Sequence, residues 1–410
     1  MLFARLARGQ GEAVAGERPV PVCRAHRHRP FVQARAAPHG PKSWPPIEEE
    51  TMFTVGRVAT GIAVIVLGLA CAGGASAISP AGGLASHARG ANTRAANPAG
   101  VLVPPVGDVY TGVSCAPALG FGAQVGKHPA VFGEFVTWGQ SIHFAFNQAA
   151  AAHATLMLHI STAQGSGGSG VITPQAIARG DGDEYLVTLS RLIASYGRPI
   201  FIRLFPEMNN ANNPYSAYNL DGSSRGPEFS QAEFIAAWRR VVTVLRGGAV
   251  AAIDTQLAAL GQPRLHGVAR AGSLPQSQIS FVWTPETAGT PAIAGNDPRN
   301  YYPGNQYVDW VGTDFYSRFP NFTGLDAFYK EFPQKPFAFG EWAIWGGDNP
   351  VFVKQLFAWV DQHRRVQMML YNQGFGSDSP FALSADPAST QAIRADLAPA
   401  RFLAYTPTWQ

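Results

Sequence analysis

Cysteine and charged residues are both scarce in this sequence. Three cysteines occur among 410 residues, too few for a disulfide-dense scaffold or a four-cysteine zinc site. Asp, Glu, Lys and Arg make up 14% of the chain, against about 25% in an ordinary globular domain, which excludes a disordered polyelectrolyte. Hydrophobic residues reach 46%, so the chain is long and apolar enough for one large α/β domain or two ordinary ones.

The first hundred residues have the features of a leader and a linker. Residues 1–51 are rich in Arg, His, Pro and Ala without apolar periodicity, which predicts a disordered or mis-annotated N-terminal extension. Residues 52–77 begin at an internal methionine, Met52, carry a basic start and an apolar stretch, and end on small residues, so a secretory signal peptide is expected. An uncleaved membrane anchor and a lipoprotein cysteine at Cys71 are the alternatives. Residues 78–107, rich in Gly and Pro, are predicted to be a flexible linker.

The positive net charge belongs to the predicted leader. The whole chain has a formal charge of +4, with 31 Lys and Arg against 27 Asp and Glu. Nine of these basic residues and five of the acidic ones lie in residues 1–77, which leaves 22 of each sign. The predicted mature chain is therefore neutral, keeps Cys115 alone and forms no internal disulfide. This balance gives no ground for a nucleic-acid partner.

From about residue 108 the sequence alternates between strand and helix patterns. Several of the β-rich runs are almost continuously hydrophobic, as expected for parallel strands buried on both faces. The predicted strands span residues 109–114, 131–137, 155–160, 199–205, 279–283, 308–316, 336–339 and 366–371. Eight strands with intervening helices predict a (β/α)8 TIM barrel, a single catalytic domain over residues 108–410. A doubly wound sheet is the alternative, but no Gly-rich dinucleotide fingerprint follows the first strand.

The helix ends are marked by capping residues. Ser230 and Glu233 form a capping-box pattern before an apolar helical stretch. Asn349 followed by a proline predicts an N-cap with a first-turn Pro, and Gly197 predicts the end of the helix that precedes the fourth strand. These boundaries support the strand and helix order.

Two glutamates stand at the exits of predicted strands. Glu207 follows the fourth strand, and Glu341 follows the seventh. In a barrel, the carboxyl ends of the strands carry the active site. In a chain with so few charges, both acids are therefore candidate catalytic residues. The alternative for each is a structural ion pair with a neighbouring Lys or Arg.

The motifs around these two acids resemble glycoside hydrolase family 26. The similarity covers roughly residues 108–403 and rests mainly on Arg203-x-x-x-Glu207-Met208-Asn209, on residues 301–310 (Tyr-Tyr-Pro-Gly-x-x-Tyr-Val-Asp-Trp) and on residues 335–341. The resemblance implies a retaining endo-hydrolase, with Glu207 as the acid/base and Glu341 as the nucleophile. Most members of the family are β-mannanases, and some act on β-glucans or β-xylans.

The chain departs from the family pattern beside the acid/base. Mannanases of the family usually carry His directly before that glutamate, whereas Pro206 stands here. Residues 210–215 replace the Trp-rich stretch that commonly follows. Both changes fall on the expected sugar-binding floor and leave the two carboxyl groups in place. The substrate class is therefore less well predicted than the chemistry, with β-mannan as the first choice and β-glucan or β-xylan next.

The chemistry of a retaining glycosidase leads to an expectation for the pKa of Glu207 and suggests roles for Tyr316 and Arg203. Its two carboxyl groups lie about 5–5.5 Å apart, and this proximity together with partial burial is expected to raise the pKa of Glu207. Tyr316 ends the sixth strand and is expected to donate a hydrogen bond to Glu341. Arg203 is expected to hold Glu341 or another acid in its charged form, because an interior arginine needs a carboxylate partner. A barrel-rim tyrosine and a structural ion pair are the alternatives.

Sugar binding is predicted for side chains at the strand ends. Aromatic residues gather there, and Trp283 and Trp342 are the preferred candidates for stacking on sugar rings, with a core position as the alternative. His159 and Asn209 are further candidates for hydrogen bonds to the substrate. Residues 181–183 (Asp-Gly-Asp) lack the spacing of a calcium loop, and helix capping is expected for them instead.

The sequence thus predicts a secreted retaining endo-β-glycosidase without cofactor. No metal site is expected, because residues 108–410 hold neither a His-x-His nor a His-Glu-x-x-His pattern. The expected partner is a polysaccharide or oligosaccharide substrate, with no nucleic acid, and the expected state is a monomer. A glycan-binding barrel without turnover is the alternative function.

Overall fold

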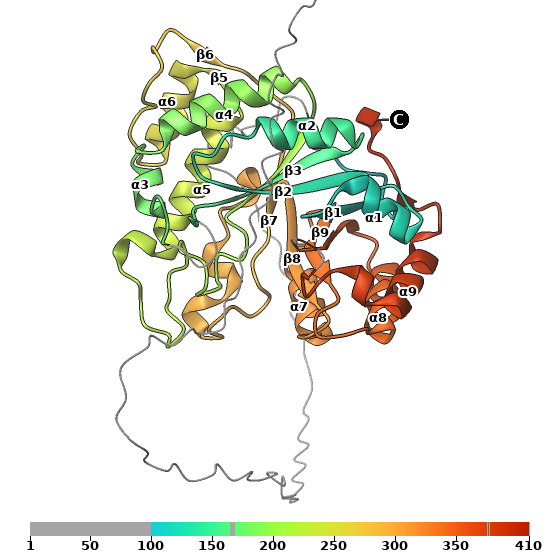
Figure 1. Cartoon of the computed structure of the whole chain (residues 1–410). Coiled ribbons are helices and arrows are strands. Elements are labelled where there is room, and N and C mark those ends of the chain that lie inside the picture. Colours follow the sequence, from blue (N-terminus) through green and yellow to red (C-terminus); the bar gives the residue numbers. More distant parts are fainter. Residues whose placement is uncertain (1–99, 165–168, 375, 377, 410) are drawn as a thin grey trace, which may run out of the picture. The chain divides into compact units, whose positions relative to one another are not determined.

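Eight parallel strands close into a barrel in the computed structural model, which describes residues 100–164, 169–374, 376 and 378–409 (Figure 1). The strands are β1 (Val109–Ser114), β2 (Val131–Thr137), β3 (Thr155–Ser161), β4 (Ile200–Leu204), β7 (Ile279–Trp283), β8 (Trp310–Tyr316), β9 (Phe337–Ala343) and β10 (Val366–Asn372). They pair in chain order, and β10 pairs with β1 over residues 110–114 and 368–372. The predicted (β/α)8 barrel is confirmed, and this closure excludes a doubly wound sheet.

Helices follow the strands along the chain and surround the barrel. The α-helices are α1 (Ala118–Val125), α2 (His143–Ala151), α3 (Pro174–Ala178), α4 (Asp183–Tyr196), α5 (Gln231–Leu245), α6 (Val250–Ala259), α7 (Phe322–Glu331), α8 (Pro350–Gln362) and α9 (Pro387–Leu397). The 3-10 turns are η1 (Pro227–Phe229), η2 (Ala294–Asn296), η3 (Pro298–Tyr301), η4 (Asn305–Tyr307), η5 (Leu383–Ala385) and η6 (Pro407–Trp409). Short strands β5 (Gly248–Ala249) and β6 (Ser273–Leu274) form an antiparallel pair, and β11 (Phe402–Leu403) pairs with β1.

The predicted helix boundaries are confirmed by the capping contacts. The hydroxyl of Ser230 accepts a hydrogen bond from the backbone N–H of Glu233, and the side chain of Asn349 accepts one from Phe352. Gly197 ends α4 in the left-handed conformation at φ 68°, which glycine adopts without steric cost.

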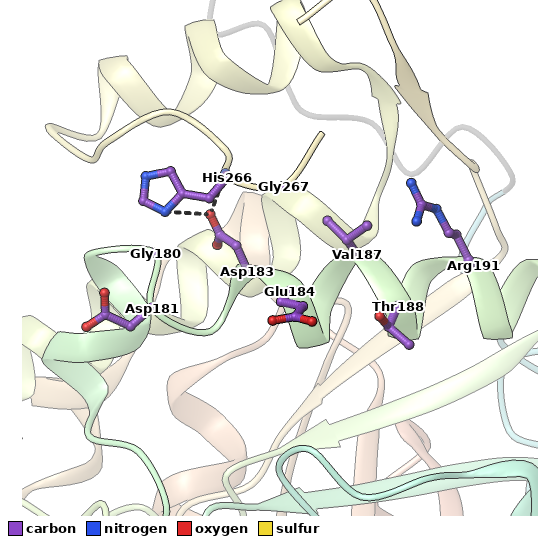
Figure 2. Close-up of a pocket in the computed structure, with 9 residues that line it drawn as sticks. All are labelled: Gly180, Asp181, Asp183, Glu184, Val187, Thr188, Arg191, His266 and Gly267. Atoms are coloured by element: carbon purple, nitrogen blue, oxygen red, sulfur yellow. Dashed lines mark hydrogen bonds and ion pairs between the residues drawn. The ribbon is translucent and has the colours of Figure 1, made fainter. Parts of the chain in front are cut away.

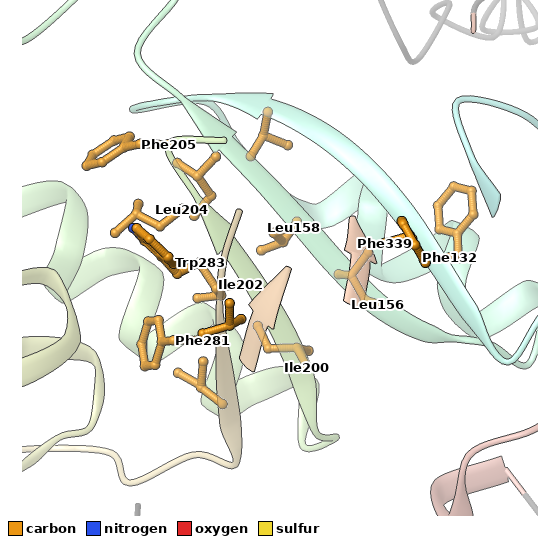
Figure 3. Packing of buried hydrophobic residues seen from close by; sticks show 14 of the residues in the cluster. Phe132, Leu156, Leu158, Ile200, Ile202, Leu204, Phe205, Phe281, Trp283 and Phe339 are labelled. Atoms are coloured by element: carbon orange, nitrogen blue, oxygen red, sulfur yellow. The ribbon is translucent and has the colours of Figure 1, made fainter. Parts of the chain in front are cut away.

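The core has two layers separated by the barrel wall. The inner cluster takes one or more residues from every barrel strand, among them Tyr110, Phe201 and Trp310. The outer cluster packs between strands and helices and includes Ile200, Ile202 and Leu204 of β4 (Figure 3). Because side chains alternate along a strand, Arg203 of β4 lies on the inner face together with Phe201.

The amino end of the barrel is covered by residues that precede β1. The backbone N–H of Leu102 donates to the hydroxyl of Ser280 at 2.9 Å, and the indole N–H of Trp310 donates to the carbonyl of Leu102 at 3.2 Å. Contacts with the barrel therefore begin inside the predicted 78–107 linker. The predicted extension, the signal peptide and the linker up to residue 99 lie outside the described residues. No helix in the described part of the chain is long and apolar enough to cross a membrane.

Candidate active site

Glu207 lies in a strained turn directly after β4. Phe205 and Glu207 both adopt positive φ angles, 46° and 50°, which non-glycine residues occupy at an energetic cost and mainly where surrounding contacts hold them. Those contacts are present. The N–H of Glu207 donates to the carbonyl of Thr284 at 2.8 Å, and the hydroxyl of Tyr215 donates to the carbonyl of Pro206 at 2.6 Å. The turn therefore fixes where the Glu207 carboxyl group lies.

Glu341 lies within β9 and owes its orientation to a β-bulge. The register between β8 and β9 shifts by one residue, so that Thr313 pairs with Phe339 while Asp314 pairs with Glu341. A second shift occurs against β10 between Phe339 and Trp342. An extra residue reverses the alternation of side chains. The bulge at Gly340 therefore turns Glu341 into the barrel and leaves Trp342 outside.

Arg203 connects three strands from the centre of the barrel. It has no exposed surface. Its guanidinium donates to Glu341 on β9, to Asp314 on β8 and, at 2.7 Å, to the hydroxyl of Thr284. Burial opposes the charge of Arg203, but the carboxyl groups of Asp314 and Glu341 outweigh it and raise the pKa of Arg203 above its ordinary value. The expected contact between Arg203 and Glu341 is thus present, with Asp314 as a second partner.

The other carboxyl oxygen of Glu341 accepts two hydrogen bonds. The Tyr316 hydroxyl donates to it at 2.5 Å, as expected from the sequence, and the Asn372 side-chain amide donates at 2.8 Å. Asn372 also donates to the Tyr316 oxygen at 3.0 Å. Glu341 is therefore held by donors on both oxygens while its side chain keeps about 12% of its surface exposed.

His159 lies beneath this network and touches protein groups with both ring nitrogens. Its Nδ1 lies 3.0 Å from a guanidinium nitrogen of Arg203, and its Nε2 lies 3.3 Å from the Ser114 hydroxyl. Because arginine can only donate, Nδ1 accepts and Nε2 carries the proton. Burial and the charge of Arg203 lower the pKa of His159 well below its ordinary value. A Cβ on Gly133 would come within 2.5 Å of Nε2, so glycine there makes room for the imidazole.

Asp314, Glu286 and Asn372 belong to the site, although the sequence analysis did not select them. Glu286 follows β7 by three residues, so the strand-exit rule that selected Glu207 applies to it as well. Asp314 and Asn372 lie within β8 and β10. They can be recognised as site residues only once it is known which side chains of these strands face the barrel interior. The described residues thus place four carboxyl groups at this end of the barrel.

Crowding of these carboxyl groups favours their protonated forms. Burial, followed by the charges of Glu286 and Glu341, raises the pKa of Glu207 to about 8, although Arg203 opposes the shift. Burial also raises the pKa of Glu286 to about 7 and that of Asp314 well above its ordinary value. Glu207 can therefore hold a proton at neutral pH, as a general acid requires.

The tryptophans selected from the sequence lie on the outer face of the wall. Trp283 has no exposed surface and packs edge-on against Tyr302 and Phe332, among the outward-facing side chains of Figure 3. Trp342 is 2% exposed and lies edge-on to Phe357 of α8. Neither ring is accessible from the barrel mouth.

Asn209 and Trp345 have different surroundings. Asn209 is fully buried, and its amide bonds to both backbone groups of Glu286. Trp345 is half-buried and lies edge-on to Tyr316 at 5.7 Å between ring centroids. Trp345 is therefore an aromatic ring beside the Glu341 network that keeps access to solvent.

A cavity of about 550 Å³ lies outside the carboxyl site just described, against the first turns of α4 (Figure 2). None of the residues that line it belongs to a barrel strand. Asp183 at its floor forms a two-point ion pair with the buried Arg240, at 2.8 and 2.6 Å. Among the described residues, no group of three or more His, Cys, Asp or Glu is placed to hold a metal ion.

Comparison with known proteins finds similarity in the solved structures alone. Neither protein-family models nor curated proteins give a match. A modular endo-β-1,4-mannanase from Cellulomonas fimi, described with the family 26 mannanases, is 18% identical, with 72% of each chain covered and a TM-score of 0.48. The Bacillus subtilis mannanase man26 is 16% identical over 74% of this chain and 88% of its own, with a TM-score of 0.48. GH26A from Muricauda sp. is 15% identical over 72% and 91%, also with a TM-score of 0.48.

Proposed function

We propose that the protein is a secreted retaining endo-β-glycosidase that hydrolyses a neutral β-glycan by double displacement. The observation that carries the proposal is the arrangement of two glutamates at one end of the barrel. Glu207 is held in a strained turn with a raised pKa, and Glu341 is held by donors on both carboxyl oxygens. A retaining glycosidase needs one protonated carboxyl group to donate to the leaving oxygen and one carboxylate to attack the anomeric carbon.

In the first step, Glu207 donates its proton to the glycosidic oxygen while a carboxylate oxygen of Glu341 attacks the anomeric carbon. The bond between the anomeric carbon and the leaving sugar breaks, and a covalent glycosyl–Glu341 ester forms. In the second step, Glu207 as carboxylate takes a proton from water, whose oxygen attacks the anomeric carbon and displaces Glu341. Two inversions leave the configuration of the anomeric carbon unchanged, and both glutamates return to their starting forms.

The residues around Glu341 act on its charge and orientation. Arg203 donates to one oxygen, and Tyr316 and Asn372 donate to the other. These three donors fix the orientation of the Glu341 carboxyl group before it attacks the anomeric carbon. His159 supports Arg203 from below, because its neutral Nδ1 accepts one guanidinium hydrogen.

The substrate proposal starts from β-mannan, with β-glucan and β-xylan next. β-Mannan comes first because the motifs resemble family 26, in which β-mannanases predominate. The neutral charge balance of residues 78–410 suits an uncharged polymer, and Trp345 offers a ring for stacking beside Glu341. Secretion rests on the predicted signal peptide, and N-terminal sequencing of the protein from the culture medium tests it: a start near residue 78 supports secretion, and a start well before it contradicts it.

Reducing-sugar release tests the activity. The wild type is incubated with β-mannan, mixed-linkage β-glucan and β-xylan, beside Glu207→Ala and Glu341→Ala. We expect release from at least one polymer and a loss of at least about 10²-fold in each variant, the usual contribution of an acid/base group. A wild type that binds a glycan but releases no more sugar than the variants would instead be a non-catalytic binding protein.

A further inference from the structure

A third glutamate lies beside Glu207, with one side-chain amide between the two. The Asn210 amide nitrogen lies 2.8 Å from a carboxyl oxygen of Glu286 and 3.3 Å from a carboxyl oxygen of Glu207. Glu286 comes from the loop after β7, whereas Glu207 and Asn210 come from the turn after β4. Two separate loops therefore bring both carboxyl groups to the same amide.

The orientation of this amide is fixed by its oxygen. The Asn210 Oδ1 accepts from the backbone N–H of Asn212 at 2.9 Å and from its side-chain amide at 3.0 Å. Since an amide oxygen accepts and an amide nitrogen donates, the reversed orientation would set donor against donor. The NH₂ group of Asn210 therefore faces the two carboxyl groups.

Hydrogen bonds to backbone groups also join the turn after β4 to the loop after β7. The buried Asn209 side chain accepts from the N–H of Glu286 at 2.8 Å and donates to its carbonyl at 2.9 Å. The N–H of Thr290 donates to the Asn209 carbonyl at 2.9 Å, and the N–H of Ala211 donates to the Thr290 carbonyl at 2.7 Å. The backbone of Glu286 is thus held in place by contacts that do not involve the charge of its side chain.

We propose that Glu286 is a positioning residue that, through Asn210, keeps the proton on the acid/base Glu207; this inference rests on the proposed function. A glutamine at position 286 would accept the same hydrogen bond from Asn210. What the carboxyl group adds is negative charge beside Glu207. Two close carboxyl groups lose their protons in two separated steps, so an ionised Glu286 disfavours loss of the Glu207 proton.

Other charged groups around Glu207 also act on its pKa, and their effects can be compared with that of Glu286. Arg203 from β4 favours the ionised form of Glu207, whereas Glu341 from β9 disfavours it. Asp314 from β8 faces the same carboxyl group. After burial, the charge of Glu286 is the largest contribution to the raised pKa of Glu207. In the second step of hydrolysis, the same charge favours transfer of a proton from water back to Glu207.

The test is the pH dependence of Glu286→Gln. We expect the basic limb of kcat/KM to move to lower pH by about one unit, a tenfold change in the ratio of protonated to ionised Glu207, while kcat/KM on the acidic side of the optimum is largely kept. Glu286→Asp should restore much of the shift because it restores the charge. Glu184→Gln, an exposed change on α4, should leave the profile unchanged.

A measurement without substrate separates this inference from the proposed function. Carboxyl-carbon NMR follows the titration of Glu207 in the wild type and in Glu286→Gln, and by reciprocity that of Glu286 in Glu207→Gln. We expect each glutamate to lose its proton at lower pH when the other is replaced. Unchanged titration of the remaining glutamate in either variant would overturn the inference. Absence of hydrolysis by the wild type would overturn the proposed function, whereas these titrations would still decide the coupling.

Discussion

Arg203 donates a hydrogen bond to Glu341 from a position without solvent exposure, and the same guanidinium also holds Asp314. The cation is surrounded by partners from four strands or their exits: His159, Thr284, Asp314 and Glu341. A buried cation is tolerated when it is paired and hydrogen-bonded in this way. Arg203 therefore supports both the barrel interior and the charge on the proposed nucleophile.

The first prediction concerns the stability that depends on Arg203. Arg203→Ala leaves two carboxyl groups in the interior without their cation, and breaking a buried pair in this way costs about 3–5 kcal/mol. Arg203→Lys keeps a charge but lacks the planar fork that reaches both partners, so an intermediate loss is expected. Urea denaturation followed by circular dichroism measures the free energy of unfolding. Unchanged midpoints in both variants would contradict the role of this network.

The second prediction concerns the hydroxyl of Tyr316. Tyr316→Phe removes one donor to Glu341, and a hydrogen bond to a charged group contributes about 1.5–3 kcal/mol, which corresponds to a loss of roughly 10- to 150-fold in kcat/KM. The matched control is Tyr302→Phe, because the Tyr302 hydroxyl bonds to Asn305 on an exposed segment. Steady-state kinetics on the preferred glycan should show the loss in the first variant alone. Equal rates for the two variants would remove Tyr316 from the mechanism.

The third prediction follows from the raised pKa of Glu207. Its folded-state pKa of about 8 lies above the ordinary value of 4.5 for a glutamate, so the folded protein binds its proton more tightly than the unfolded chain. The free energy of unfolding therefore gains from this group below about pH 4.5 and loses that gain as the pH rises towards 8. Glu207→Gln should melt at a higher temperature than the wild type at pH 8–9, with a much smaller difference at pH 5.

Thermal unfolding across this pH range checks the third prediction. Glu184→Gln serves as the control, because Glu184 is exposed on α4 and its replacement should leave the pH dependence as it is in the wild type. If Glu207→Gln melts at the wild-type temperature at pH 8–9, burial does not raise the pKa of Glu207 and the prediction is wrong.

The fourth prediction distinguishes a structural role for Trp283 from a glycan-binding role for Trp345. Trp283→Ala deletes a fully buried ring, which costs about 3–5 kcal/mol of stability. Trp345→Ala removes a half-buried ring beside Tyr316, so we expect a higher KM for the glycan with a smaller loss of stability. Melting temperatures and KM values for both variants decide the matter. A raised KM for folded Trp283→Ala, without one for Trp345→Ala, would reverse the assignment.

The barrel itself was predictable because each strand has its own local pattern. The first, second and fifth predicted strands coincide with β1, β2 and β7. The largest difference is in β9, which was expected to end at residue 339 and continues to Ala343. The continuation includes the bulge around Glu341, and a bulge depends on pairing with the neighbouring strands, which no local pattern records.

That bulge also explains the position of Trp342. The face on which Trp342 lies depends on counting side chains along β9, and one extra residue reverses the count. Asp314 was missed for a related reason, because its significance lies in its contact with Arg203 on another strand. Glu286 has the same strand-exit position as Glu207, but its contact with Asn210 joins two different loops and is visible only in the structure.

The most direct test of the two glutamates is azide rescue of Glu207→Ala and Glu341→Ala with an aryl β-glycoside of the preferred glycan. In Glu207→Ala, azide should attack the covalent glycosyl–Glu341 ester and give the β-glycosyl azide. In Glu341→Ala, azide should occupy the place of the missing nucleophile and give the α-glycosyl azide. ¹H NMR of the two products distinguishes the anomers. The same anomer from both variants, or no rescue of either, would contradict double displacement by Glu207 and Glu341.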